Sequence, residues 1–259
     1  MKTQLKVSII QSHLHWENPV ANRTQFSEKI AAISEDTDLI ILPEMFTTGF
    51  TMNAASLAEE TNGVTLFWMQ SEAKKKNAAL TGSIIIKDDG LFYNRLFFVF
   101  PDGTFHQYDK KHTFALAGEH KTYQAGQNKL IVTYKGWKIC PLVCYDLRFP
   151  VWARNKEDYD LLVYVANWPD KRVNAWDALL KARAIENMAY CIGVNRVGLD
   201  GNGHQYTGHS AGYDVLGELL TTSDYEKEFT ETITLEKEHV VTLRDRLQFL
   251  QDRDYFEIK

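Results

Sequence analysis

The stretch "GWKICPLVCYD" at residues 136–146 is an apolar run that ends in polar residues. A short apolar run bounded in this way predicts a buried β-strand, and here the strand is expected to stop at Cys144. The thiol of Cys144 would then lie where a strand meets a loop. Such a cysteine is either a nucleophile or ordinary core packing, and packing is the commoner outcome for a cysteine judged alone.

Strand and helix patterns alternate on both sides of this run without a linker or a repeat, which predicts one α/β domain over residues 1–259. Strands are predicted at residues 5–11, 37–46, 129–146, 159–168 and 191–198. Helical periods predict helices at residues 22–35, 64–77, around 150–156, and 174–190. The turn signals "DDG" and "PDG" within residues 78–112 predict antiparallel hairpins. Hairpins mixed with βα units indicate a mixed sheet, or a pair of sheets, covered by helices.

The last stretch, residues 229–259, has a strand pattern followed by a helical pattern. Leu243, Leu247 and Leu250 recur there at helical spacing. An apolar stripe of this kind packs either on its own domain or on a second subunit, and the leucines alone do not choose between the two.

Composition excludes several classes of protein. The chain of 259 residues is 44% apolar and 24% charged, so it can bury a sizeable core. Its net charge of −5 gives no electrostatic reason to bind nucleic acid. No segment approaches the roughly 20 apolar residues of a membrane helix, and the first apolar stretch is too short for a signal peptide. We therefore expect a cytoplasmic protein whose cysteines, Cys140, Cys144 and Cys191, are reduced.

Two other kinds of site are not favoured. "GHSAG" at residues 208–212 matches a nucleophile elbow centred on Ser210, but a polar loop precedes it and a strand-like run follows, so a hairpin strand is expected. Cys140 with Cys144, or His13 with His15, lack partners at zinc spacing. Since no glycine-rich phosphate loop follows a strand either, the sequence favours chemistry without a metal or cofactor.

Three reactive residue types instead occupy equivalent positions at strand ends. Glu44 follows a strand that Pro43 ends, and Lys110 follows a β-rich run. Cys144 follows the apolar run "ICPLV" at residues 139–143. Each has an ordinary explanation when taken singly: a loop carboxylate, a surface lysine and a buried thiol. The ends of neighbouring strands converge, however, so the three side chains are expected to meet.

The stretches that carry these residues resemble a known family. "LPEMFTTGF" at residues 42–50, "YDKKHTF" at 108–114 and "CYDLRFP" at 144–150 are similar to the three signatures of the nitrilase superfamily of carbon–nitrogen hydrolases. The resemblance extends over nearly the whole chain and includes the framework stretches "NWP", "ARAIEN" and "VNRVG". It is closest to the bacterial omega-amidase branch, which hydrolyses omega-amides of 2-oxo acids such as 2-oxoglutaramate and 2-oxosuccinamate. It implies an α-β-β-α sandwich of two mixed sheets flanked by helices, and a homodimer.

Residue roles follow from the same resemblance. It makes Glu44 the general base, Lys110 an electrophilic lysine and Cys144 the nucleophile that forms a thioester. Lys111 is then a neighbour, because the family pattern of tyrosine, lysine and histidine at alternate positions fits Lys110. The family often has a second glutamate, for which Glu119 is the candidate. The backbone N–H of Tyr145 would join Lys110 in an oxyanion hole.

Substrate contacts are expected from residues near the same loops. A 2-oxo acid amide carries a carboxylate, and Arg148, Lys171 and Arg172 are candidates to bind it. For Arg148 an internal ion pair with Asp146 is the favoured interpretation. Candidates for an apolar wall are Phe46 and Trp168.

The sequence is also compatible with two other interpretations. Another branch of the superfamily, such as a deaminated-glutathione amidase, a carbamoylase or a nitrilase, would share the three reactive residues and differ in its pocket. A binding module without catalysis could retain the same fold, although it would have no chemical need for all three residues.

Overall fold

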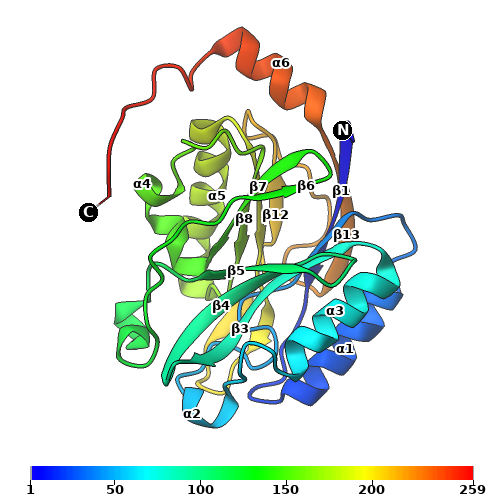
Figure 1. The fold of residues 1–259 in the computed structure, drawn as a ribbon, viewed down its shortest axis with the longest axis vertical. Coiled ribbons are helices and arrows are strands. Elements are labelled where there is room, and N and C mark those ends of the chain that lie inside the picture. Colours follow the sequence, from blue (N-terminus) through cyan, green and yellow to red (C-terminus); the bar gives the residue numbers. More distant parts are fainter. Residues whose placement is uncertain (1, 259) are drawn as a thin grey trace.

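Residues 2–258, which the computed structural model describes, form two β-sheets with helices on their outer faces (Figure 1). The first sheet has the order β13-β1-β2-β3-β4-β5, and the second has the order β12-β9-β8-β7-β6. Strands of the first sheet are β1 (Gln4–Gln11), β2 (Leu39–Ile41), β3 (Ala79–Asp88), β4 (Leu91–Val99), β5 (Phe105–Asp109) and β13 (Phe229–Glu236). Strands of the second are β6 (Val132–Tyr134), β7 (Trp137–Val143), β8 (Leu161–Val165), β9 (Tyr190–Val194) and β12 (Ala211–Tyr213). A separate hairpin pairs β10 (Val197–Leu199) with β11 (Gln205–Thr207).

Helices cover both sheets. The α-helices are α1 (Pro19–Ala31), α2 (Ala54–Leu57), α3 (Val64–Lys76), α4 (Pro150–Ala153), α5 (Val173–Asn187) and α6 (Lys237–Leu247). Short 3₁₀ helices are η1 (Ala115–Ala117), η2 (Glu119–Lys121), η3 (Cys144–Arg148) and η4 (Asp170–Arg172). None of the helices within residues 2–258 is long and apolar enough to cross a membrane.

Each sheet mixes strand directions. In the first, β1, β2 and β3 are parallel, whereas β13, β4 and β5 pair antiparallel with their neighbours. In the second, β7, β8 and β9 are parallel and β6 and β12 are antiparallel edges. The expected α-β-β-α arrangement of two mixed sheets is therefore confirmed.

Alternation along the strands decides which side chains face which layer. In β2, Leu39 and Ile41 belong to the core between the two sheets, whereas Ile40 belongs to the core under α1 and α3. Successive side chains of a strand point to opposite faces. A strand covered on both faces must therefore be apolar throughout, as this one is.

Close packing of α5 on the second sheet depends on one glycine. A Cβ atom at Gly193 of β9 would lie 2.5 Å from Leu180 Cδ1 and 2.6 Å from the Trp176 ring. Both side chains are fully buried. The helix can lie this close to β9 only because residue 193 has no side chain.

Several predicted boundaries were wrong. The first helix begins at Pro19, earlier than residue 22, because the Asn18 side chain accepts a hydrogen bond from the Ala21 N–H and caps it. Residues 129–146 form two strands instead of one, since Lys135 and Gly136 adopt positive φ angles of 50° and 86° in a turn. The prediction for Ser210 is confirmed, because the strand β12 follows it and no helix does.

The C-terminal leucines pack on their own chain in this structure. Leu243 of α6 is buried in the core, and Leu247 and Leu250 pack against it partly buried. The helix ends at Leu247, so Leu250 lies beyond it. Arg244 anchors α6 by donating to the backbone oxygens of Met188 at 2.8 Å and Tyr159 at 2.6 Å.

Candidate active site

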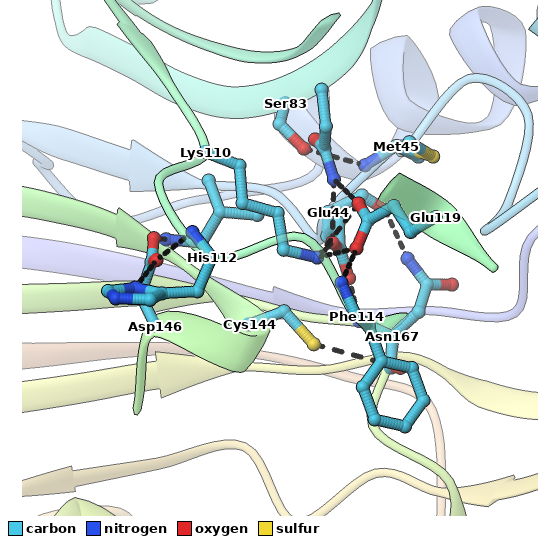
Figure 2. Close-up of polar contacts among 12 residues, drawn as sticks. Glu44, Met45, Ser83, Lys110, His112, Phe114, Glu119, Cys144, Asp146 and Asn167 are labelled. Carbon is cyan, nitrogen blue, oxygen red and sulfur yellow. Dashed lines mark hydrogen bonds and ion pairs between the residues drawn. The ribbon is translucent and has the colours of Figure 1, made fainter. Parts of the chain in front are cut away.

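The three residues expected to meet at strand ends do so. Glu44 follows β2, Lys110 follows β5 directly, and Cys144 opens η3 at the end of β7. The Lys110 Nζ atom donates to Glu44 Oε1 at 2.8 Å, and both side chains are almost completely buried. Figure 2 shows the lysine reaching toward the carboxylates from one side, with the Cys144 thiol nearby. Glu44 and Lys110 are 66 positions apart in sequence, and Lys110 and Cys144 are 34 positions apart, yet all three lie at one site.

Glu119 completes a buried cluster around the same ammonium group. Lys110 Nζ lies 3.0 Å from Glu119 Oε1 and 2.9 Å from Oε2, and the Phe114 N–H also donates to this carboxylate. Glu119 is 0% exposed. Glu119, the candidate for the second glutamate, is therefore hydrogen-bonded to Lys110 (Figure 2).

Burial and charge act in opposite directions on these groups. Burial by itself lowers the pKa of Lys110, but the carboxylates of Glu119 and Glu44 raise it by more, so the lysine stays protonated. Burial raises the pKa of Glu119, and the charge of Glu44 adds to this effect, against the lowering by Lys110. One buried cation is thus shared between two carboxyl groups.

Cys144 is held in a conformation that few residues adopt. Its φ angle is +44°, in the left-handed region, which an L-residue occupies only when its surroundings compel it. Asp146 Oδ2 accepts a hydrogen bond from the Val143 N–H at 3.1 Å and so closes the turn around the cysteine. The thiol itself lies 3.9 Å from the Asn167 carbonyl oxygen.

The Cys144 thiol is neutral at rest. Burial raises its pKa well above the usual value, and the nearby charge of Glu44 raises it further, while Lys110 lowers it. A neutral thiol is a weak nucleophile. It must therefore lose its proton to a neighbouring base as it attacks.

The expected ion pair between Asp146 and Arg148 is wrong. Asp146 instead accepts hydrogen bonds from Tyr108 Oη at 2.7 Å and from the His112 N–H at 2.9 Å, and its Oδ1 lies 2.7 Å from His112 Nδ1. In a 3₁₀ turn, residues two positions apart point in different directions. Arg148 consequently faces away, with its guanidinium 4.9 Å from the centre of the Trp168 ring.

A cavity of about 450 Å³ opens onto the thiol and the lysine. Four of the expected substrate contacts line it, together with further aromatic and polar side chains. The lining includes Lys110, Cys144, Tyr145, Arg148, Trp168, Lys171 and Arg172, as well as Phe50, Phe114, Asp170, His204 and Tyr206.

Phe46 was wrongly predicted to line the cavity. It is fully buried on the helix side of the first sheet, with its ring 5.6 Å from those of Phe26 and Trp68. Met45 has a φ angle of +41°, so the backbone turns at this residue. The turn directs the Phe46 side chain away from the cavity. Phe50 takes the expected place, with its ring 5.2 Å from Lys110 Nζ.

Two asparagines at the site were not singled out from the sequence. Asn94 of β4 donates through Nδ2 to Glu44 Oε1 at 2.8 Å and to Glu119 Oε1 at 3.3 Å. The Asn167 N–H donates to Glu44 Oε2 at 2.8 Å, and its side chain donates to the Glu44 backbone oxygen. The available signals were a polar residue inside a β-rich run for Asn94 and a position at a strand end for Asn167.

Comparisons with known proteins relate the whole chain to amidases. The carbon-nitrogen hydrolase family model matches residues 6–244. The omega-amidase YafV of Escherichia coli (strain K12) is 44% identical over 254 residues, which are 98% of each chain. A 2-oxoglutaramate amidase of Bacillus subtilis is 30% identical over 226 residues, covering 85% of this chain and 87% of that protein.

Solved structures agree with these relationships. XC1258 from Xanthomonas campestris, a CN-hydrolase superfamily protein with an arsenic adduct in its active site, superposes with a TM-score of 0.96 at 40% identity. That comparison covers 100% of both chains. Nit3 of Saccharomyces cerevisiae, a member of branch 10 of the nitrilase superfamily, has a TM-score of 0.85 at 22% identity over 95% of each chain, which indicates a shared fold.

Proposed function

Because this chain belongs to the carbon-nitrogen hydrolase family, we propose that it is an omega-amidase. It hydrolyses the omega-amide of 2-oxo dicarboxylic acid monoamides, 2-oxoglutaramate and 2-oxosuccinamate, to the acid and ammonia. The observation that carries the proposal is the buried Glu44–Lys110–Glu119 cluster beside Cys144 at a cavity. A binding module would have no use for a buried cation and two carboxyl groups placed against a neutral thiol, because burying such charges is costly.

The first half of the reaction acylates Cys144. The sulfur attacks the amide carbon while its proton passes to Glu44. Glu44 Oε1 already accepts hydrogen bonds from Lys110 and Asn94, whereas Oε2 accepts one from the Asn167 N–H and from no other group in residues 2–258. An ionised carboxylate oxygen has two lone pairs, so Oε2 retains a site for the proton.

Charge then develops on the former carbonyl oxygen. The Lys110 ammonium and the Tyr145 N–H, which lies in the first turn of η3 where helix N–H groups lack intrahelical acceptors, stabilise this oxyanion. The tetrahedral intermediate collapses, the carbon–nitrogen bond breaks, and Glu44 returns the proton to the departing ammonia. The product is a thioester on Cys144.

The second half releases the acid. Glu44 takes a proton from water as the hydroxyl oxygen attacks the thioester carbon. Collapse of this second intermediate expels the sulfur, which recovers a proton from Glu44. Lys110 and the Tyr145 N–H serve the oxyanion in both halves, so one set of donors is used twice.

The charge of the cavity favours an anionic substrate. Arg148, Lys171 and Arg172 line it, and none of the three forms an ion pair with another residue in the described range 2–258. The Arg172 guanidinium lies 5.1 Å from the centre of the Phe114 ring, which orients it. A 2-oxo acid offers a carboxylate to these cations, while the ammonium group of glutamine would be repelled.

Domain organisation, location and assembly belong to the same proposal. We place a single carbon–nitrogen hydrolase domain over residues 1–259 in the cytoplasm and expect a homodimer. Apolar side chains left exposed near the C-terminus, Phe249 and Tyr255, support a partner surface there. Light scattering coupled to gel filtration measures the subunit number, and a monomer at micromolar concentration would contradict the dimer.

A substrate panel tests the activity. Ammonia release is measured with 2-oxoglutaramate, glutamine, deaminated glutathione, carbamoyl amino acids and simple nitriles. We expect the highest kcat/KM with 2-oxoglutaramate, and no turnover of any amide would exclude the proposal. Intact-mass analysis during turnover should detect an acyl adduct that Cys144→Ala abolishes, and an adduct that survives this substitution would exclude Cys144 as the nucleophile.

A further inference from the structure

Asn94 occupies an unusual place between the two carboxyl groups of the site. It lies in the middle of β4 with 1% of its surface exposed. Its single amide nitrogen donates to both Glu44 Oε1 and Glu119 Oε1, at 2.8 Å and 3.3 Å. The amide oxygen of Asn94 is buried and has no hydrogen-bond partner among residues 2–258.

An unpartnered buried oxygen needs an explanation, because such groups destabilise a fold. Buried asparagines elsewhere in the chain avoid this cost: Asn22 and Asn195 each use both the oxygen and the nitrogen of the amide. Only two asparagines leave a buried amide oxygen without a partner in the described part of the chain, Asn94 and Asn167. Both of them donate to Glu44.

The orientation of the Asn94 amide is dictated by charge. Rotating the amide by half a turn would place its oxygen against the oxygens of Glu44 and Glu119, which repel it. The observed orientation supplies two N–H donors to the carboxylates and sacrifices the acceptor. The Asn94 amide therefore donates to both carboxylates while its own oxygen stays without a hydrogen bond.

We propose that Asn94 is a positioning residue that holds the Glu44 carboxylate turned toward Cys144, beside the carboxylate of Glu119. The inference rests on the proposed amidase function and adds a residue to it. Titratable groups around Glu44 are Lys110 after β5, Glu119 in η2, Cys144 in η3, and Tyr123, which follows η2.

Two physical effects follow from the Asn94 bonds. A hydrogen bond donated to an ionised carboxylate stabilises the charged form, so loss of the donor disfavours it. The same bond holds Glu44 Oε1 in place, so that Oε2 is left to receive the thiol proton. Lys110 cannot supply a further donor, because its three N–H groups are already directed at Glu44 Oε1 and at both oxygens of Glu119.

The test replaces Asn94 with leucine, which has a similar shape and no N–H donors. The acid limb of the pH profile of kcat/KM should move upward by about one pH unit, as expected for a lost hydrogen bond to a charged group. The value of kcat near neutral pH should fall roughly tenfold, while KM changes by less than about twofold. Asn94→Ser, which can donate one hydrogen bond, should give an intermediate shift. It also provides a test if the leucine variant does not fold.

Thr81→Val is the matched control. Thr81 is buried in the neighbouring strand β3 and donates to the Phe97 backbone oxygen at 2.8 Å, without contact to the site. Its substitution should lower the melting temperature and leave the acid limb unchanged. An acid limb that stays in place in folded Asn94→Leu, or moves equally in Thr81→Val, would overturn the proposal.

A second readout separates this inference from the proposed function. The rate of alkylation of Cys144 by iodoacetamide is followed by intact mass at a series of pH values. This profile reports how the neighbouring base assists deprotonation of the thiol, and it needs no amide substrate. Asn94→Leu should shift the lower limb of this profile upward by a similar amount. If the wild-type protein hydrolyses no amide, the amidase function fails, and the alkylation profile alone still decides the role of Asn94.

Discussion

Replacing Lys110 with methionine removes the one cation among residues 2–258 that pairs with the two buried carboxyl groups of Glu44 and Glu119. Methionine has nearly the same length, so the packing of the side chain is kept and the loss is electrostatic. Glu44 and Glu119 are both 0% exposed and both bond to the lysine Nζ. Without the cation the two carboxylates cannot both stay ionised, and the folded variant must take up a proton that the pair shares.

The cost follows from proton linkage. In the unfolded chain a glutamate has a pKa of about 4.3, so holding one proton on the folded variant costs about 1.36 × (7 − 4.3), or about 3.7 kcal/mol, near pH 7. Near pH 5 the same product is about 1 kcal/mol. The first figure lies within the roughly 3–5 kcal/mol typical of a buried ion pair that has lost one partner.

The sign of the pH dependence is therefore defined. The folded variant has a carboxyl pKa raised above the unfolded value, so its stability increases as the pH falls from neutral toward about 4.3. Urea unfolding followed by tryptophan fluorescence, at about pH 7 and about pH 5, measures this for the wild type and Lys110→Met. The double variant Lys110→Met/Glu119→Gln is the control, because removing one of the two carboxylates should restore most of the loss near neutral pH.

Two results would contradict an electrostatic origin of the stability loss. One is a loss of stability that is the same at both pH values, which would mean that packing and not charge sets the cost. The other is a double variant less stable than Lys110→Met, which would mean that Glu119 stabilises the fold independently of the lysine.

Three further predictions concern the nucleophile, the substrate and the turn. Burial raises the pKa of Cys144, so the thiolate absorbance lost in Cys144→Ala should be absent near pH 8 and emerge only at higher pH; a thiolate already present at about pH 7 would contradict the neutral resting thiol. Arg172→Leu should raise KM for 2-oxoglutaramate roughly ten- to a hundredfold with little change in kcat, as expected for a lost charge-assisted hydrogen bond, and an unchanged KM would remove Arg172 from substrate binding. Asp146→Asn should lower the free energy of unfolding by about 1–3 kcal/mol and also lower kcat, because the new amide cannot accept all the hydrogen bonds that hold Cys144 at positive φ. Unaltered unfolding and turnover would show that the turn does not need this carboxylate.

Much of the fold could be predicted because it depends on local patterns. Apolar runs of strand length and periodic helices indicated mixed sheets covered by helices. The same local signals placed Glu44, Lys110 and Cys144 at strand ends. Element boundaries were less accurate, since the start of α1 depends on a cap at Asn18 and the division of residues 129–146 depends on a turn at Gly136.

Side-chain directions in the loops could not be predicted in the same way. Phe46 and Phe50 are alike in type and close in sequence, yet only Phe50 reaches the cavity, because the backbone turns at Met45. Asp146 and Arg148 are near neighbours of opposite charge, yet the 3₁₀ turn separates them. These outcomes depend on single φ angles, for which the sequence carries little signal.

Local sequence signals were enough to place the reactive residue types after the strands, because strand ends and turns are local properties. How these residues share charge depends on the three-dimensional fold. The cluster of Glu44, Lys110 and Glu119, and the Asn94 amide between the carboxyl groups, exist because β2, β4 and β5 lie in one sheet beside η2. Protonation and hydrogen bonding depend on distances of a few ångströms between segments far apart in the chain, and folding alone sets those distances.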